Sequence, residues 1–127
     1  MILVDTDVLI ANLRGRENAR AWLREARSRT GRLAVSVVTN TEIIGGMRSA
    51  ERREVYELLD SLRPMPLTDA IARRAGELRR AYRRSHASIS VVDYLIAATV
   101  EVHGLDLATL NTKHFPMVEG LRAPFTG

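Results

Sequence analysis

The 127-residue sequence has no cysteine, one lysine and few aromatic residues. The lack of cysteine excludes disulfides and thiolate metal sites, and it favours a reducing compartment. With aromatic residues at 5%, the core has to be built from alanine, valine, isoleucine and leucine. No apolar run approaches the roughly 20 residues that a membrane helix requires. The start, MILVDTDVLI, carries acids within its apolar run and has no cationic leader, unlike a signal peptide. We therefore expect a cytoplasmic protein without a membrane segment.

Arginine supplies almost all of the positive charge. The formal net charge is +4 and the sequence pI is near 10.3. The guanidinium group binds phosphate through two parallel hydrogen bonds, so an arginine-rich basic protein suits a polyanionic partner. An arginine-rich genome would give the same charge to an ordinary solvated surface, and composition does not separate these two explanations.

Short apolar runs alternate with segments of helical periodicity. Buried strands are predicted at residues 2–4, 33–38 and 107–110, with a connection or edge strand around Pro64 and Pro66. Helices are predicted at residues 8–13, 19–26, from about 39, at 55–62, 67–84 and 91–102. The last of these is apolar nearly all round and should be buried, with Gly104 ending it. This alternation indicates a single α/β domain, residues 1–127, in three layers: a parallel sheet with helices on both faces.

Three acids stand where ordinary surface charge does not explain them. Asp5 ends the apolar run ILV, Glu42 follows the run LAVSVV, and Asp93 lies within VVDYLIAA. Ligands of open α/β sheets bind outside the carboxyl ends of the strands, where Thr109 and Asn111 also follow the last strand. We expect these segments to bring oxygen donors to one edge of the sheet.

Helix capping is the alternative explanation for two of these acids. Thr39-x-x-Glu42 has the pattern of a capping box, and Ser90-x-x-Asp93 is a weaker version of it. Capping explains Asp5 less well, because Asp7 is available to cap the helix that follows. The occurrence of all three acids together favours a site.

A carboxylate cluster without cysteine or paired histidines suits Mg²⁺ or Mn²⁺ rather than zinc. On a basic protein it suggests phosphodiester hydrolysis, in which the metal activates water and neutralises developing charge. Asp5 and Asp93 would be direct ligands, and Glu42 a ligand or the group that orients the water. The three histidines show no metal-ligand spacing, and His114 is expected to pack the loop after Asn111 together with Phe115.

The segments ILVDTDVLI, SVVTNTEIIGG and SVVDYLIAATVEVHGLDLATLNTKHF resemble PIN-domain ribonucleases, specifically the VapC toxins of bacterial toxin–antitoxin pairs. The resemblance covers nearly the whole chain, with the motifs in order. It implies a Mg²⁺-dependent endoribonuclease that inhibits translation by cutting tRNA, rRNA or mRNA. It also implies a PIN-like sheet of about five mainly parallel strands, a homodimer, and a VapB-type antitoxin that blocks the site.

By position, the family's acids fall on Asp5, Glu42 and Asp93. The fourth position, often aspartate, is Asn111 here, and a neutral amide is a weaker ligand for magnesium. This departure puts a stable second metal ion in doubt. The catalytic set implied by the resemblance is therefore Asp5, Glu42, Asp93 and Asn111.

Further residues are expected to support this set. Thr109 and Thr6 would lie beside the ligands, and Asp7 would either support them or, preferably, act as a helix N-cap. An arginine-rich side of the helix at residues 67–84 is a candidate RNA track, although a solvated face fits equally well. Its representative residues are Arg73, Arg80 and Arg84.

Two other functions remain open at this point. Asp5-Thr6-Asp7 after a strand also resembles the opening motif of haloacid-dehalogenase-type phosphatases, but Lys113 is not followed by the late acidic pair that they require. A non-catalytic RNA- or antitoxin-binding module with a degenerate site is supported only by Asn111.

Overall fold

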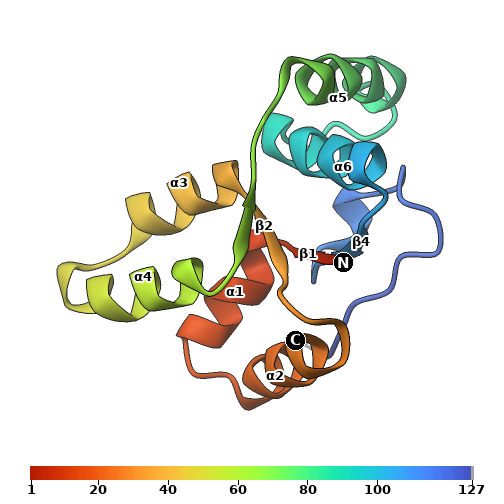
Figure 1. The fold of residues 1–127 in the computed structure, drawn as a ribbon. Coiled ribbons are helices and arrows are strands. Elements are labelled where there is room, and N and C mark those ends of the chain that lie inside the picture. Colours follow the sequence, from red (N-terminus) through yellow and green to blue (C-terminus); the bar gives the residue numbers. More distant parts are fainter. Residues whose placement is uncertain (127) are drawn as a thin grey trace.

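In the computed structural model, which describes residues 1–126, four parallel strands form one sheet (Figure 1). In spatial order they are β3 (Arg63–Met65), β2 (Ala34–Ser36), β1 (Ile2–Val4) and β4 (Asp106–Ala108). Leu3 of the central β1 pairs with Ala34 of β2 and with Leu107 of β4. The described residues thus form four strands, rather than the about five that the resemblance implied.

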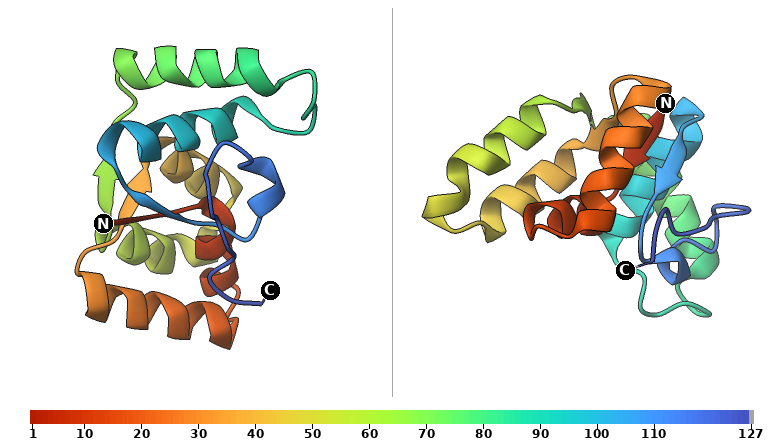
Figure 2. Two further views of the ribbon diagram at one scale, coloured as in Figure 1. Left: turned by 90° about the vertical axis from the view of Figure 1, so that its right-hand side faces the viewer. Right: turned by 90° about the horizontal axis from the view of Figure 1, so that it is seen from below.

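Within residues 1–126, six α-helices cover the two faces of this sheet, and the predicted three-layer α/β/α architecture is confirmed. They are α1 (Thr6–Leu13), α2 (Glu17–Thr30), α3 (Val37–Gly46), α4 (Arg52–Asp60), α5 (Asp69–Tyr82) and α6 (Val91–His103). Short 3-10 helices occupy Ser49–Glu51 (η1) and Thr112–His114 (η2). In Figure 2, α5 is the outermost layer and α6 lies between it and the sheet, whereas α1, α2 and α4 lie on the opposite side.

The strands alternate their side chains between two apolar clusters. Leu3 packs in the cluster beneath α5 and α6, whereas Ile2 and Val4 pack in the cluster formed with the first four helices. Successive side chains of a strand point to opposite faces, so both faces of β1 are apolar and covered. This burial explains the continuous ILV run that precedes Asp5.

The strands end earlier than the apolar runs suggested. The Ser36 hydroxyl accepts a hydrogen bond from the Val38 amide at 3.2 Å, which ends β2 and starts α3 at Val37. The predicted strand 33–38 and the predicted helix start at Thr39 are therefore both wrong at this boundary. β4 ends at Ala108, because the Leu110 amide that follows donates to a side chain instead of to a strand.

The predictions for α6 and for the edge strand are largely confirmed. Gly104 has φ 62°, and its amide closes α6 on the carbonyls of Glu101 and Val100. The middle of α6 is buried, but its ends are not: Val91 and Val102 are about half exposed. Pro64 lies in β3, an edge strand, where its missing amide donor is tolerated.

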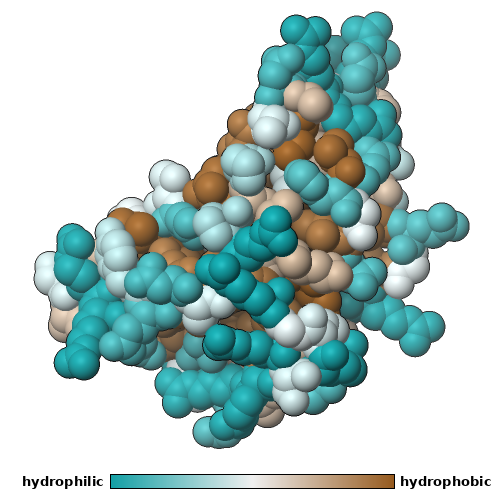
Figure 3. Space-filling model, viewed as in Figure 1, coloured by the Kyte–Doolittle hydropathy of each residue, from teal (hydrophilic) through white to brown (hydrophobic). Residues whose placement is uncertain are grey.

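On the face drawn in Figure 3, hydrophobic residues gather near the centre, and hydrophilic residues cover the helix ends. No helix between residues 1 and 126 has the length and apolarity needed to cross a membrane.

Candidate active site

Asp5 lies at the carboxyl end of β1 and is only 6% exposed. Its amide donates to the Ala108 carbonyl at 2.9 Å, which continues the pairing with β4. Its Oδ1 accepts from the Thr6 amide at 2.8 Å, and its Oδ2 accepts from the Thr109 hydroxyl, also at 2.8 Å. Asp5 is therefore the N-cap of α1, and the prediction that Asp7 takes this position is wrong. Asp5 has the extended backbone that an N-cap requires, whereas Asp7 is already inside the first helical turn.

The Asp7 carboxylate instead binds the segment that follows β4. Its Oδ2 accepts from the Leu110 amide at 3.0 Å and lies 3.3 Å from the Thr109 hydroxyl. Its Oδ1 is buried without a hydrogen-bond partner among the described residues. The Thr109 hydroxyl has a single hydrogen to offer to the carboxylates of Asp5 and Asp7, and it also accepts from the Asn111 amide at 3.1 Å. Two carboxylates thus share one hydroxyl donor.

The electrostatics of this pair favour a cation. Burial raises the pKa of Asp5 from 3.8 to about 6, with further increases from the charges of Asp7 and then Asp93, against the opposing hydrogen bonds from Thr109 and Thr6. Burial also raises the pKa of Asp7. Within residues 1–126, no salt bridge reaches Asp5 or Asp7, although the chain has nineteen arginine and lysine residues. Among the described residues, the negative charge of Asp5 and Asp7 is therefore left without a salt bridge.

Glu42 reaches the edge from the second turn of α3. Its Oε1 accepts from the Thr6 hydroxyl at 2.7 Å, and the Thr39 hydroxyl lies 3.0 Å from the same Thr6 hydroxyl. The capping-box interpretation of Thr39 and Glu42 is wrong, because α3 begins before both and is capped by Ser36. Thr6 therefore joins α1 to the exposed acid on α3.

The sequence left open whether Asp93 is a helix cap or an acid of the site, and both descriptions apply to it. It forms the capping box of α6: its Oδ2 accepts from the Ser90 amide at 3.1 Å, and its own amide donates to the Ser90 hydroxyl at 3.2 Å. It also raises the pKa of Asp5, which places it at the same edge. A third contact, from His114 Nδ1 to the same Oδ2 at 3.2 Å, was not predicted. No spacing rule could have found it, because the contact depends on how the last loop folds back.

The donor set fits a hard divalent cation. Every candidate donor is an oxygen, and the buried, unpartnered Oδ1 of Asp7 lies beside the uncompensated Asp5. As they stand, however, the described residues contain no group of three acid, histidine or cysteine side chains close enough to hold a metal ion. In this arrangement the Glu42 carboxylate is bonded to Thr6, and Oδ2 of Asp93 is bonded to the Ser90 amide.

Two of the candidate RNA-binding arginines, Arg73 and Arg80, lie on α5, whereas Arg84 lies beyond its end at Tyr82, so the predicted helix to residue 84 ends two residues early. Arg73, Arg80 and Arg84 are all exposed, and Arg73 forms a surface ion pair with Asp69 at 2.8 Å. Because α6 separates α5 from the sheet, α5 is on the outermost layer (Figure 2).

Comparison with known proteins defines the class. The family described as PIN domain matches residues 2–120, and the chain therefore belongs to the PIN-domain family. The chain is 62% identical to Ribonuclease VapC10 of Mycobacterium tuberculosis, with 98% of this chain and 93% of that protein covered. Ribonuclease VapC19 of the same organism is 38% identical, with 98% and 100% covered. Within the PIN-domain family, its similarity is thus to the VapC ribonucleases.

Solved structures agree with this assignment. A toxin–antitoxin complex from Klebsiella pneumoniae contains a chain with a TM-score of 0.82 and 27% identity, with 98% of both chains covered. FitAcB from Neisseria gonorrhoeae gives a TM-score of 0.73 and 28% identity, with 91% of both chains covered. Membership of the PIN-domain family sets aside the haloacid-dehalogenase alternative.

Proposed function

We propose that this protein is an endoribonuclease that requires a divalent cation, Mg²⁺ or Mn²⁺, and acts as the toxin of a toxin–antitoxin pair. The observation that carries the proposal is the uncompensated pair formed by the buried Asp5 and the half-buried Asp7, with Asp93 at the same edge. Burying carboxylates without a cationic partner costs stability, and an ion bound during function accounts for that cost. The likeness to VapC10 specifies RNA as the polymer that is cut.

Each residue has a defined task in this proposal. Asp5 and Asp93 bind the cation, and Glu42 binds it or orients the attacking water. Thr109 holds Asp5 through its hydroxyl, and the neutral Asn111 is a weaker fourth donor at the end of the same segment. When bound, the cation supplies an activated water and neutralises charge that develops on the phosphate.

The test is cleavage of RNA by the purified protein with Mg²⁺, with Mn²⁺ and with EDTA. Asp5→Ala, Glu42→Ala and Asp93→Ala should each lower the rate by at least about 100-fold, as expected when a charge-neutralising ion is lost. Asp106→Ala is the matched control, because Asp106 is an exposed acid at the opposite end of β4. Full activity in EDTA would contradict the proposal, and RNA binding without cleavage would favour the non-catalytic module.

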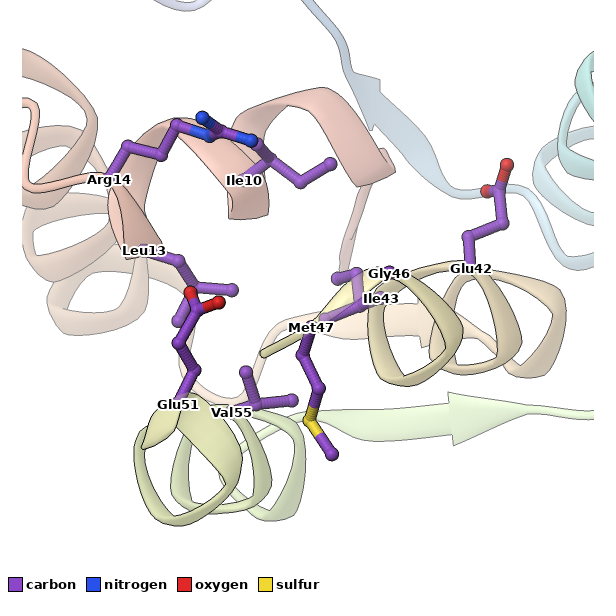
Figure 4. Close-up of a pocket in the computed structure, with 9 residues that line it drawn as sticks. All are labelled: Ile10, Leu13, Arg14, Glu42, Ile43, Gly46, Met47, Glu51 and Val55. Carbon is purple, nitrogen blue, oxygen red and sulfur yellow. The ribbon is translucent and has the colours of Figure 1, made fainter. Parts of the chain in front are cut away.

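We further propose that a separate VapB-type antitoxin covers this edge and that the protein is a homodimer. A pocket between α1, α3 and α4 is lined by apolar side chains that include Leu13, Ile43, Met47 and Val55, with Glu42 at one end (Figure 4). An antitoxin segment seated in this pocket would lead directly to the acids. An arginine at its end would pair with them in place of the cation, because a guanidinium binds carboxylates through two hydrogen bonds.

Two measurements test the partner. Leu13→Asp should weaken capture of the co-expressed antitoxin, because it buries a charge in the apolar part of the pocket. Deleting the antitoxin's C-terminal segment should restore nuclease activity to the complex. Undiminished inhibition by the truncated antitoxin would refute blocking at the acids. Sedimentation of the toxin alone should give the mass of two chains.

A further inference from the structure

His114 makes a contact with Asp93 that neither the capping motif nor the predicted ligand set explains. Its Nδ1 lies 3.2 Å from Oδ2 of Asp93, and both side chains are mostly buried. A hydrogen bond across this distance needs a proton on Nδ1, which the neutral ring carries in one tautomer as well as when it is charged. Such a bond would form with either charge state of the imidazole.

The two carboxylate oxygens of Asp93 have different surroundings. Oδ2 accepts from the Ser90 amide and lies 3.2 Å from Nδ1 of His114, whereas no hydrogen bond to Oδ1 is found within the described residues. The Ser90 amide and the imidazole therefore both approach one oxygen of the carboxylate. They leave the other oxygen available to a cation. A ligand carboxylate held by hydrogen bonds in this way is the usual pattern around protein-bound metals.

The ring sits on a segment that is itself anchored. Phe115, the next residue, is 1% exposed and packs in the apolar cluster beneath α5 and α6. The His114 amide donates to the Asn111 carbonyl at 3.0 Å and closes the 3-10 turn η2. His114 thus connects the Asn111 segment to the N-terminus of α6, the two places from which Asp93 and Asn111 reach the site.

We propose that His114 is a positioning residue for Asp93. A hydrogen bond from its Nδ1–H would hold Oδ2 and leave Oδ1 free for a cation, and the contact keeps the Asn111 segment against α6. This inference rests on the proposed metal-dependent function. His114 itself touches neither the cation nor the RNA.

The test separates the hydrogen bond from the space that the ring fills. His114→Leu keeps most of the volume and removes the donor, whereas His114→Asn places an uncharged N–H donor close to the position of Nδ1. His103→Leu is the matched control, because His103 is exposed at the far end of α6. Calorimetry of Mn²⁺ binding and the separate values of kcat and KM for RNA cleavage are measured for each variant.

His114→Leu should weaken Mn²⁺ binding by roughly tenfold and lower kcat by a similar factor, as for other residues that orient metal ligands. KM should stay the same, and His114→Asn should restore most of both losses. The proposal is overturned if His114→Leu matches the wild type, or if His114→Asn is as impaired as His114→Leu.

A measurement on the metal-free protein tests the positioning role of His114 separately from the proposed nuclease activity. The Ser90 amide donates to the same Oδ2, so its NMR shift reports the orientation of Asp93 in the metal-free protein. It should move in His114→Leu and stay near its wild-type value in His114→Asn. If wild-type protein neither binds Mn²⁺ nor cuts RNA, the proposed function fails. If the Ser90 amide is unchanged in His114→Leu, the positioning role fails.

Discussion

Replacing Asp5 with asparagine should stabilise the metal-free protein at neutral pH while abolishing its activity. The pKa of Asp5 is raised from 3.8 to about 6 in the fold, chiefly by burial. A shift of this size corresponds to an upper limit of about 3 kcal/mol of unfavourable free energy when the carboxylate is ionised at pH 7. Asparagine keeps the oxygen that accepts from Thr6, but its amide group faces Thr109, whose hydroxyl has to turn to accept. We therefore expect a net gain of about 1–2 kcal/mol.

The sign of the pH dependence follows from the same shift. Between pH 3.8 and about 6 the folded protein holds a proton on Asp5 that the unfolded chain has released, so stability falls as the pH rises through this window. Lowering the pH from 7 to 5 should therefore recover about 1 kcal/mol of the penalty in the wild type. The raised pKa of Asp7 acts in the same direction in both proteins.

Urea unfolding in EDTA at pH 7 and pH 5 measures both effects, and Asp106→Asn serves as the exposed control. The advantage of Asp5→Asn over the wild type should be largest at pH 7 and should shrink at pH 5. Adding Mn²⁺ should stabilise the wild type and not the variant, because only the carboxylate binds the ion strongly. An Asp5→Asn protein that is less stable than the wild type at pH 7 would refute the argument from burial.

Three further predictions concern other parts of the molecule. Asn111→Asp should raise Mn²⁺ affinity in calorimetry, because it adds a charged oxygen; unchanged affinity would place Asn111 outside the coordination sphere. Replacing Arg73, Arg80 and Arg84 together by Gln should weaken RNA binding and flatten its dependence on salt, and an unchanged slope would show a merely solvated face. Tyr94→Phe should raise the unfolding free energy by about 1 kcal/mol, because the Tyr94 hydroxyl is buried without a partner within residues 1–126; a loss in urea unfolding would indicate a hidden partner.

The layers of the fold and the edge that holds the site follow from local patterns in the sequence. Apolar runs mark strands buried on both faces, and the helical spacing marks the helices that cover them. The position of Asp5 after the first run then places it at the carboxyl end of the sheet. The capping box of Ser90 and Asp93 is also local, and the sequence indicates it as the alternative to a site because its members lie three residues apart.

Features that depend on one backbone angle or on tertiary folding were not predictable in this way. Asp5 and Asp7 both have the side chain of an N-cap, and only the extended backbone at Asp5 decides between them. The end of β2 at Ser36 was also not predictable, because a serine is compatible both with a strand that continues and with the N-cap of a helix such as α3. The contact between His114 and Asp93 joins segments that no periodicity relates.

The double role of Asp5, as helix cap and as site acid, has a genetic consequence. Asparagine caps helices as well as aspartate does, and one base change converts the codon of either residue into that of the other. A single base change at this position can therefore inactivate a harmful nuclease, because the substitution of asparagine for Asp5 removes the charge without unfolding the chain. Such an allele would persist as an inactive protein that still occupies the antitoxin, and it would leave active copies in the same cell less restrained.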